Sequence, residues 1–233
     1  MSTAHVYLIP TPLDESALHT LPAYLTPVIQ QCEVWFVENE RSARRFLKQL
    51  WKEINIDYYK WHTIHKAKTE VAKAFQQYVK EGRHIGILSE AGCPGIADPG
   101  QQLVAIAQEM GAMVHPLVGP SSILLALMAS GMNGQQFQFH GYLPIDAVER
   151  KKKLKELEQD SIKRNCTQIF IETPYRNNAL LRDIVTACHH STKLCIAAAL
   201  TSANEKVVTK TVAQWKNRLP DLHKMPSIFL IAI

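Results

Sequence analysis

Short apolar runs recur along the chain, and within each run the apolar residues are consecutive rather than alternating with polar ones. Alternation at every second residue is typical of a strand with one exposed face, whereas an unbroken run suits a strand that is covered on both faces. The sequence therefore predicts buried strands. They lie at residues 6–9, 34–37, 85–88, 169–171 and 196–200.

Between these runs, apolar residues follow the spacing of an amphipathic helix. One such segment covers residues 43–51, with apolar residues at i, i+3, i+4, i+7 and i+8. Similar patterns cover residues 71–79, 103–110 and 180–188, and Gly111 is typical of a helix stop. Strands and helices thus alternate, which predicts an α/β fold with mostly parallel strand pairing.

The alternation is interrupted near residues 116–119. About five strand–helix units precede this break, and after it Gly119-Pro120-Ser121-Ser122 opens a strongly apolar helix. Residues 207–233 contain two β-like stretches around a short helix, so the second half can carry antiparallel strands. We predict two α/β domains of ordinary size, residues 1–117 and residues 118–233.

The composition is that of an ordinary globular chain of 233 residues, 46% of them hydrophobic and 20% charged. No window approaches the length of an apolar membrane span, and the N-terminal segment lacks the features of a secretory signal. The five cysteines lie far apart without a C-x-x-C pair, which argues against a disulfide framework and a zinc ribbon. We therefore expect a cytoplasmic protein with reduced thiols and no membrane association.

The net charge of +5 is distributed unevenly. Residues 1–118 carry 11 basic and 12 acidic side chains, whereas residues 119–233 carry 15 and 9. Much of the excess lies in residues 150–164, where it indicates a surface for RNA or another anion. Acidic residues interleave this segment and can pair with the basic ones at i, i+4, so a solvated helix face explains the pattern as well.

The strongest chemical signal is the stretch S-E-A-G-C-P-G-I-A-D-P-G at residues 89–100, between a predicted strand and a predicted helix. Open α/β sheets bind ligands at the carboxyl ends of their strands, and glycine lets a ligand approach the backbone closely. The loop matches neither the phosphate loop nor G-x-G-x-x-G, so it does not imply a dinucleotide. We interpret it as a ligand-binding loop; a long, well-packed connection is the alternative.

Other polar loops follow predicted strands at equivalent places. They are Pro10-Thr11-Pro12, Glu38-Asn39-Glu40-Arg41 and Glu172-Thr173-Pro174-Tyr175-Arg176. In addition, Gly119-Pro120-Ser121-Ser122 leads into a helix, whose N-terminal amide groups suit a carboxylate. Helix capping or turn formation explains each loop taken alone. Taken together, the loops predict a crevice that they share at the strand ends.

Histidine and cysteine do not add a second kind of site. His62 and His65 are three residues apart, but no third ligand type lies near them in the sequence, so we predict no metal site. Cys93 lies within the glycine-rich loop, yet no accompanying histidine–acid pattern marks it as a nucleophile.

The glycine-rich loop resembles the S-D-A-G-T-P-G-I-S-D-P-G loop of bacterial small-subunit ribosomal RNA 2′-O-methyltransferases, which belong to the tetrapyrrole methylase superfamily. The other motifs follow in the order of that family. Residues 37–44 resemble A-E-D-T-R-H-T-R, and residues 118–122 resemble P-G-P-S-[AS]. Residues 139–144 are similar to F-x-G-F-L-P, and residues 171–176 to Y-E-S-P-H-R. The resemblance runs nearly end to end.

This resemblance implies two α/β domains with S-adenosylmethionine in the cleft between them, a homodimer, and methyl transfer to a ribose hydroxyl of ribosomal RNA without a metal. Carried over by motif, it also implies the residues that contact the cofactor. They are Pro10, Ser89, Glu90, Ala91, Gly92, Gly95, Ser121, Ser122, Thr173, Pro174, Leu200, Pro226 and Ser227.

The chain departs from the family on the substrate side. Glu90 replaces an aspartate, and Asn39 replaces the second acid of the E-D pair. The H-E-H-N-E segment appears only as residues 61–66, and R-E-L-T-K is replaced by residues 198–202. Many relatives also continue beyond the position of Ile233. We hypothesise that cofactor binding is retained while the ribosomal target has changed. The catalytic candidates are Glu38, Arg41, Glu172 and Arg176.

Two alternatives stay open at this point. The first keeps the chemistry but changes the substrate to a small molecule of the tetrapyrrole type. The second is a cofactor-binding or RNA-binding protein without turnover.

Overall fold

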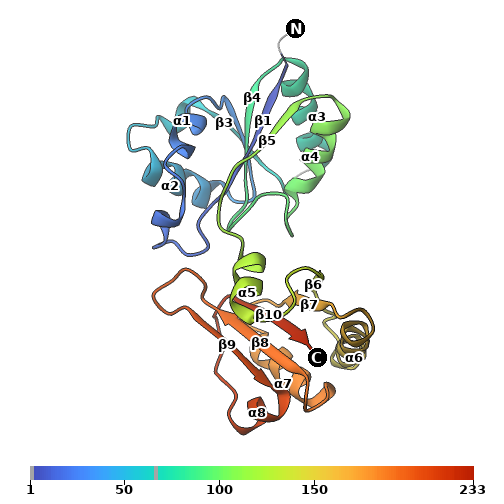
Figure 1. Ribbon diagram of the computed structural model, residues 1–233. Coiled ribbons are helices and arrows are strands. Elements are labelled where there is room, and N and C mark those ends of the chain that lie inside the picture. Colours follow the sequence, from blue (N-terminus) through green and yellow to red (C-terminus); the bar gives the residue numbers. More distant parts are fainter. Residues whose placement is uncertain (1–2, 66–67) are drawn as a thin grey trace. The chain divides into compact units, whose positions relative to one another are not determined.

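The computed structural model describes residues 3–65 and 68–233 (Figure 1). By its internal contacts the chain divides into two compact units, Met1–Ser121 and Ser122–Ile233. In the described residues each unit is built around a five-stranded sheet. Lys66, in the segment compared above with H-E-H-N-E, lies outside the described residues.

The sheet of the first unit is entirely parallel, with the strand order β3-β2-β4-β1-β5. Its strands are β1 (His5–Ile9), β2 (Val34–Val37), β3 (Lys60–Thr63), β4 (His84–Leu88) and β5 (Met113–Pro116). The helical segments are η1 (Leu18–Thr20), α1 (Leu25–Ile29), α2 (Glu40–Leu50), η2 (Ile56–Tyr58), α3 (Lys68–Lys80) and α4 (Gly100–Glu109).

Helices cover both faces of this sheet, which explains why its central strands are apolar without alternation. Successive side chains of a strand point to opposite faces, and here both faces are buried. On one face, Phe36 of β2 packs with Phe75 of α3, and α4 completes the layer (Figure 1). On the other face, Trp35 of β2 belongs to a cluster with Leu25 of α1 and Leu47 of α2.

The second unit has a mixed sheet with the order β6-β7-β10-β8-β9, in which β6 and β7 are parallel and the other neighbours antiparallel. Its strands are β6 (Phe137–Tyr142), β7 (Thr167–Ile171), β8 (Lys193–Ala198), β9 (Lys206–Thr211) and β10 (Ser227–Ala232). Its helices are α5 (Ser122–Ser130), α6 (Ala147–Arg164), α7 (Asn177–Ala187) and α8 (Val212–Asn217).

The core of the second unit lies between this sheet and the helices α6, α7 and α8. Phe170 of β7 and Phe229 of β10 are fully buried, with stacked rings 6.1 Å apart. Leu157 of α6, Ile184 of α7 and Trp215 of α8 belong to the same cluster. The amphipathic spacing of α6 and α7 is therefore explained by burial of one helix face.

The α/β fold predicted from the apolar pattern is confirmed. The predicted runs correspond to β1, β2, β4, β7 and β8, and the helical patterns to α2, α3, α4 and α7. Residues 207–233 contain antiparallel strands, as expected. The apolar pattern does not reveal β3, β5 and β6, which lie at sheet edges and have partly exposed side chains. The domain boundaries at residues 117 and 118 stay a prediction.

The helices that the structure describes include none long and apolar enough to cross a membrane.

Candidate functional site

Parallel pairing places the carboxyl ends of all five strands of the first unit at one edge of its sheet. The loops that leave this edge contain Pro10 after β1, Glu38 after β2, His65 after β3 and residues 89–100 after β4. The candidate residues of this unit are therefore brought to the edge at which open α/β sheets bind ligands.

The glycine-rich loop is joined to the loop after β1 by a two-way backbone bridge. The N–H of Thr11 donates to the carbonyl of Gly92 at 2.9 Å, and the N–H of Gly92 donates to the carbonyl of Thr11 at 3.1 Å. The Ser89 hydroxyl donates to the same Gly92 carbonyl at 3.3 Å. Gly92 has a φ of 76°, a left-handed conformation that glycine adopts without steric cost. These contacts fix the first half of the loop.

Asp98 organises the second half of the loop. One carboxylate oxygen accepts from the N–H of Gly95 at 2.8 Å, and the other from the N–H of Gly100, the first residue of α4, at 2.7 Å. Burial raises the pKa of the Asp98 carboxyl, while the bonds from Gly95, Gly100 and Gln101 act in the opposite direction. Because both carboxylate oxygens accept hydrogen bonds from backbone N–H groups of the loop, Asp98 stabilises the conformation of the loop and is not assigned to ligand binding.

The segment after β5 packs closely against the same loops. A Cβ atom added to Gly119 would lie 2.1 Å from the Cβ of Pro10, so the two backbones approach at a distance that only glycine permits. The Cys93 thiol faces the carbonyl oxygens of Gly119 at 3.7 Å and Pro120 at 3.5 Å. Burial raises the pKa of the Cys93 thiol. The thiol is thus held protonated and acts as a packed donor.

Glu38 lies at the end of β2 with its side chain 16% exposed. Its Oε1 atom accepts from the N–H of Glu90 at 3.1 Å, and its Oε2 atom lies 3.5 Å from Nε2 of His65. Burial raises the pKa of the Glu38 carboxyl, and the charges of Asp98 and Glu90 act in the same direction. A carboxyl group with this perturbation at a strand end is a candidate for proton chemistry.

Asn39 and Arg41 begin the helix that follows. The side chain of Asn39, which replaces an acid of the family motif, caps α2 by accepting from the N–H groups of Arg41 at 3.0 Å and Ser42 at 3.3 Å. Arg41 is exposed in the first turn. Its guanidinium group is therefore available to an anion at the carboxyl edge of the sheet.

Three predicted cofactor segments meet at one edge of the second sheet. The strands β7 and β8 end at this edge, and the antiparallel strand β10 begins there, with Ile228 opposite Ile171 and Ser227 opposite Ala198. The residues brought together are Thr173, Pro174, Leu200, Pro226 and Ser227.

The backbone after β8 is strained. Ala199 has a φ of 50° and Thr201 a φ of 68°, values that are uncommon outside glycine and are typical of functional sites. The N–H of Ala199 donates to the carbonyl of Pro226 at 2.8 Å. The hydroxyl of Thr201 and the Oδ1 atom of Asn177 are buried without a hydrogen-bond partner among the described residues. Unsatisfied buried polar atoms of this kind are rare and indicate a missing partner.

Glu172 and Arg176 form an ion pair that holds the turn between β7 and α7. The Glu172 side chain is 1% exposed, and its Oε1 atom accepts from the N–H of Thr173 at 2.7 Å and from the guanidinium of Arg176 at 2.7 Å. This carboxylate is thus engaged by its neighbours, and the pair fixes the position of Thr173.

Ser121 and Ser122 lie at the predicted helix start, since α5 begins at Ser122. Both side chains are partly buried.

Three residues of these edges, His65, Asn177 and Thr201, were not singled out as candidates from the sequence. Asp98 lies within the predicted ligand-binding loop, but its role as an anchor of that loop depends on backbone contacts that no motif encodes. His65 follows an edge strand that the apolar pattern did not reveal. Asn177 and Thr201 are marked only by their unsatisfied atoms. No group of three or more histidine, cysteine, aspartate or glutamate side chains in the described residues is arranged to hold a metal ion.

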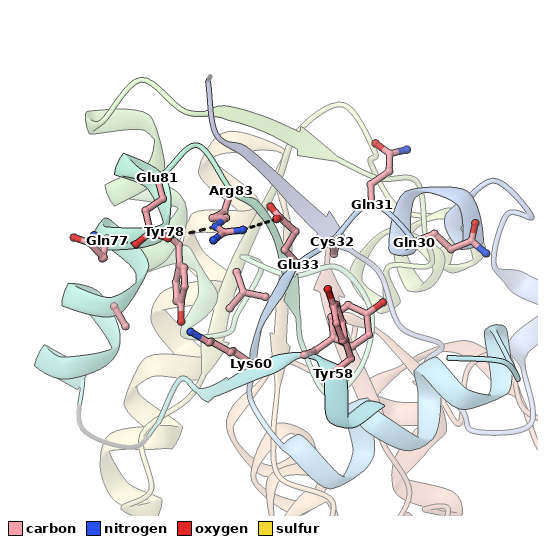
Figure 2. A pocket seen from close by; sticks show the side chains of 13 residues that line it. Gln30, Gln31, Cys32, Glu33, Tyr58, Lys60, Gln77, Tyr78, Glu81 and Arg83 are labelled. Atoms are coloured by element: carbon pink, nitrogen blue, oxygen red, sulfur yellow. Dashed lines mark hydrogen bonds and ion pairs between the residues drawn. The ribbon is translucent and has the colours of Figure 1, made fainter. Parts of the chain in front are cut away.

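A cavity of about 660 Å³ lies elsewhere in the first unit, beside the amino ends of β2 and β3. Figure 2 shows Arg83 between Glu33 and Glu81, with Tyr58 and Lys60 on another part of the lining. Arg83 pairs with Glu33 at 2.7 Å and Glu81 at 3.3 Å, so much of the charge in this cavity is neutralised. The cavity is separated from the loops described above by the length of the strands.

These features define a class of protein. The first unit is a parallel sheet that presents a glycine-rich loop at its carboxyl edge, and the second is a mixed sheet that presents strained backbone and unsatisfied polar atoms at one edge. Both arrangements are typical of α/β proteins that bind a small ligand at strand ends.

Comparison with known proteins identifies the family. Residues 5–215 match the family model of the Tetrapyrrole (Corrin/Porphyrin) Methylases. The chain is 32% identical over 209 residues to the ribosomal RNA small subunit methyltransferase I of Escherichia coli O157:H7, covering 88% of this chain and 68% of that protein. It is 29% identical over 218 residues to the protein of the same name from Bacillus subtilis strain 168, covering 91% of this chain and 70% of the relative.

Solved structures share the fold. The crystal structure of the methyltransferase CobJ superposes with a TM-score of 0.62 at 16% identity, covering 100% of this chain and 94% of that one. The uroporphyrin-III-C-methyltransferase of Thermus thermophilus gives a TM-score of 0.56 at 15% identity, covering 98% and 92%. The chain belongs to the tetrapyrrole methylase family and is a methyltransferase.

Proposed function

We propose that this methyltransferase uses S-adenosylmethionine to methylate a ribose hydroxyl of small-subunit ribosomal RNA. The observation that carries the proposal is the glycine-rich loop, held in one shape by Thr11 and Asp98 at the carboxyl edge of the parallel sheet. The choice of RNA over a small molecule is supported by the relatives, which are named ribosomal RNA small subunit methyltransferase I.

The residues at both sheet edges fit this cofactor. Gly92 and Gly95 have φ values of 76° and 84°, and a Cβ atom at Gly95 would meet only Val104, at 4.0 Å, so that a ligand can approach the backbone. The buried hydroxyl of Thr201 and the Oδ1 atom of Asn177 have no hydrogen-bond partner in the described part of the chain and suit polar groups of a ligand. The proposed cofactor-binding residues are Pro10, Ser89, Glu90, Ala91, Gly92, Gly95, Ser121, Ser122, Thr173, Pro174, Leu200, Pro226 and Ser227.

When bound, S-adenosylmethionine supplies an electrophilic methyl group on a sulfonium centre. The task of the protein is to align the substrate oxygen with that methyl group and to receive the hydroxyl proton. We assign proton handling to the neighbourhood of Glu38, whose side chain is mostly enclosed beside the glycine-rich loop. Arg41 is assigned to an RNA phosphate near the reacting ribose, because its guanidinium is exposed at the same edge.

Glu172 and Arg176 are assigned a supporting part in the reaction. Their ion pair fixes the turn that carries Thr173 and Pro174, which are proposed to contact the cofactor. Arg176 is 37% exposed and can also meet a phosphate.

The helix α6 is the proposed RNA-facing surface of the second unit. Lys152 and Lys155 are exposed on it and have no ion-pair partner among the described residues. In contrast, Lys151 lies 3.4 Å from Asp183 and Lys153 lies 3.5 Å from Glu156. The acidic neighbours therefore neutralise part of the helix. The exposed basic groups that stay unpaired among the described residues include Lys152 and Lys155, which suit a phosphate backbone.

We also propose that the protein works as a homodimer. The second unit exposes several large apolar side chains, including Met128 at 79%, Ile145 at 73% and Val148 at 73%. We propose that these side chains form part of an association surface, the role that contiguous exposed apolar patches commonly have. Light scattering should return the mass of two chains; the mass of one chain at micromolar concentration would contradict this part of the proposal. We also propose that the protein acts in the cytoplasm, where its proposed ribosomal substrate lies.

The experiment that tests the proposed function offers three substrates in parallel. Labelled S-adenosylmethionine is incubated with the protein and with small ribosomal subunits, free ribosomal RNA or a small-molecule extract. We expect label in the subunits or the free RNA. Label in the extract alone would favour a tetrapyrrole-type substrate, and label in none of the three would favour a binding protein without turnover.

A further inference from the structure

One carboxylate joins two strand-end loops of the first unit and brings a histidine to the proposed cofactor loop. Glu38 follows β2, and its two oxygens face different loops. Oε1 accepts from the N–H of Glu90 in the glycine-rich loop at 3.1 Å. Oε2 lies 3.5 Å from Nε2 of His65, which follows β3. His65 is thereby linked to the proposed cofactor loop through a single side chain.

The titratable groups around this link differ in their freedom to accept a proton. Asp98 accepts backbone N–H groups with both oxygens, from Gly95 and Gly100. The Glu38 side chain is 16% exposed and holds the amide of Glu90, whereas the His65 side chain is 57% exposed. Imidazole is also the side chain that ordinarily exchanges its proton near neutral pH. Among Asp98, Glu38 and His65, the histidine is therefore best suited to receive a substrate proton.

We propose that His65 is the general base of methyl transfer and that Glu38 is the positioning residue that orients its ring. The arrangement follows the general pattern in which a base is held by a third, acidic group. Because an ionised carboxylate only accepts hydrogen bonds, Nε2 carries the imidazole proton toward Glu38, and Nδ1 keeps the free lone pair. This assignment rests on the proposed function, since it requires a hydroxyl substrate.

The proposed step is balanced without a metal or a redox partner. The ribose O–H bond breaks as its proton passes to Nδ1 of His65, and the oxygen electron pair forms the new O–CH₃ bond. The S–CH₃ bond of S-adenosylmethionine breaks, and its electron pair returns to sulfur, which becomes neutral. The imidazolium ion then lies beside the Glu38 carboxylate until it releases the proton to water.

A purely structural tie between two loops is the competing explanation, and it predicts a different pH dependence. Among the described residues, the charged groups that face His65 are Glu38 and Asp98, and Glu90 lies next to Glu38. If His65 is the base, the single-turnover rate should rise with pH as the imidazole becomes free to accept the substrate proton, and this rise should depend on His65. If the link is only structural, loss of His65 should alter cofactor binding and folding, and leave the shape of the pH profile unchanged.

The test uses the full-length protein, ribosomal RNA substrate and three variants. His65→Gln should lower the single-turnover rate by about 10²- to 10⁴-fold, the usual contribution of a general base, and remove the rise with pH. Its affinity for S-adenosylhomocysteine should stay within about threefold of the wild type, a free-energy change well below that of a tenfold effect. Glu38→Gln should lower the rate less than His65→Gln and keep a pH-dependent limb.

His62→Gln is the matched control. His62 lies three residues earlier on β3 and stacks on Phe36 at 4.7 Å, so this variant disturbs the same strand without touching Glu38. It should retain the wild-type pH profile. A His65→Gln rate within threefold of the wild type, or an unchanged rise with pH, would overturn the assignment.

The assignment of His65 as the general base can also be tested on the protein alone, without methyl transfer to a substrate. ¹⁵N NMR of the His65 ring at neutral pH should show the tautomer protonated at Nε2, and the Glu38→Gln variant should lose this preference. A ring protonated at Nδ1 would refute the assignment. Absence of methyl transfer by the wild type, with the Nε2 tautomer present, would instead count against the proposed function.

Discussion

Asp98 offers the sharpest test of how the glycine-rich loop is built. Its carboxylate accepts from the N–H of Gly95 at 2.8 Å and of Gly100 at 2.7 Å. Pro99 is the N-cap residue of α4, and its side chain accepts no hydrogen bond from the helix. The carboxylate of Asp98 caps the first turn instead. We expect Asp98→Ala to release both the loop and the first turn of the helix.

The magnitude can be worked from these contacts. A hydrogen bond to a charged group contributes about 1.5–3 kcal/mol, and loss of a helix cap costs about 0.5–2 kcal/mol. Burial raises the pKa of Asp98, which shows that enclosure disfavours its charge, so part of this gain is already offset. The net expectation for Asp98→Ala is a loss of about 2–4 kcal/mol in the free energy of unfolding.

Urea unfolding and calorimetry with S-adenosylhomocysteine measure the two consequences. Asp98→Ala should lose stability as stated and should bind the ligand at least about tenfold more weakly, which corresponds to 1.4 kcal/mol. Asp98→Asn is the matched control, because its amide oxygen can still accept from one of the two N–H groups, and it should fall between the wild type and alanine. Full ligand affinity in a destabilised Asp98→Ala protein would refute the claim that loop shape serves binding.

Three further predictions concern Glu38, Gly119 and α6. Because folding raises the pKa of Glu38, its contribution to stability is present at acid pH and is lost as the pH rises through the folded pKa. Glu38→Gln should therefore gain stability relative to the wild type between pH 4 and pH 7, roughly the range above the ordinary carboxyl pKa. If urea unfolding shows the same difference in stability between the two proteins at every pH, the burial argument is contradicted. Gly119→Ala places a Cβ 2.1 Å from Pro10 and should destabilise the protein by about 1–3 kcal/mol. In Gly134→Ala the added Cβ meets no described atom within 4 Å beyond its chain neighbours, so this variant should not show the loss in the same assay. Reversing the charges of Lys152 and Lys155 should weaken RNA binding and reduce its salt dependence by about 0.7–0.9 in log–log slope per lost phosphate contact; filter binding at several salt concentrations that returns the wild-type slope would exclude α6 as the RNA surface.

The sequence predicts the central strands well and the edge strands poorly, for a physical reason. The four residues of β2 are all buried, so selection for apolar side chains leaves an unbroken run. In β3, by contrast, the side chains are partly exposed, and Lys60 and His62 are tolerated because an edge strand has solvent on one side. Residues such as His65, which leave an edge strand, are therefore found only when the sheet is seen.

Motifs located the loops of the candidate site but not the contacts inside them. The predicted position of the glycine-rich loop, between a strand and a helix, is confirmed, because β4 precedes the loop and α4 follows it. The engagement of Asp98 with two backbone amides, and the burial of Glu172 in an ion pair, depend on the path of the folded backbone. Strain at Ala199 and the unsatisfied hydroxyl of Thr201 are three-dimensional properties with no sequence signature.

Mass spectrometry of nucleosides tests the central claim most directly. Small-subunit ribosomal RNA that has been incubated with the protein and S-adenosylmethionine is digested to nucleosides, and each is fragmented into its base and its sugar. The proposed function predicts a protein-dependent nucleoside with one added methyl group on the ribose fragment and an unchanged base. A methyl group on the base fragment, or no methylated nucleoside in RNA from subunits and from free RNA alike, would contradict it.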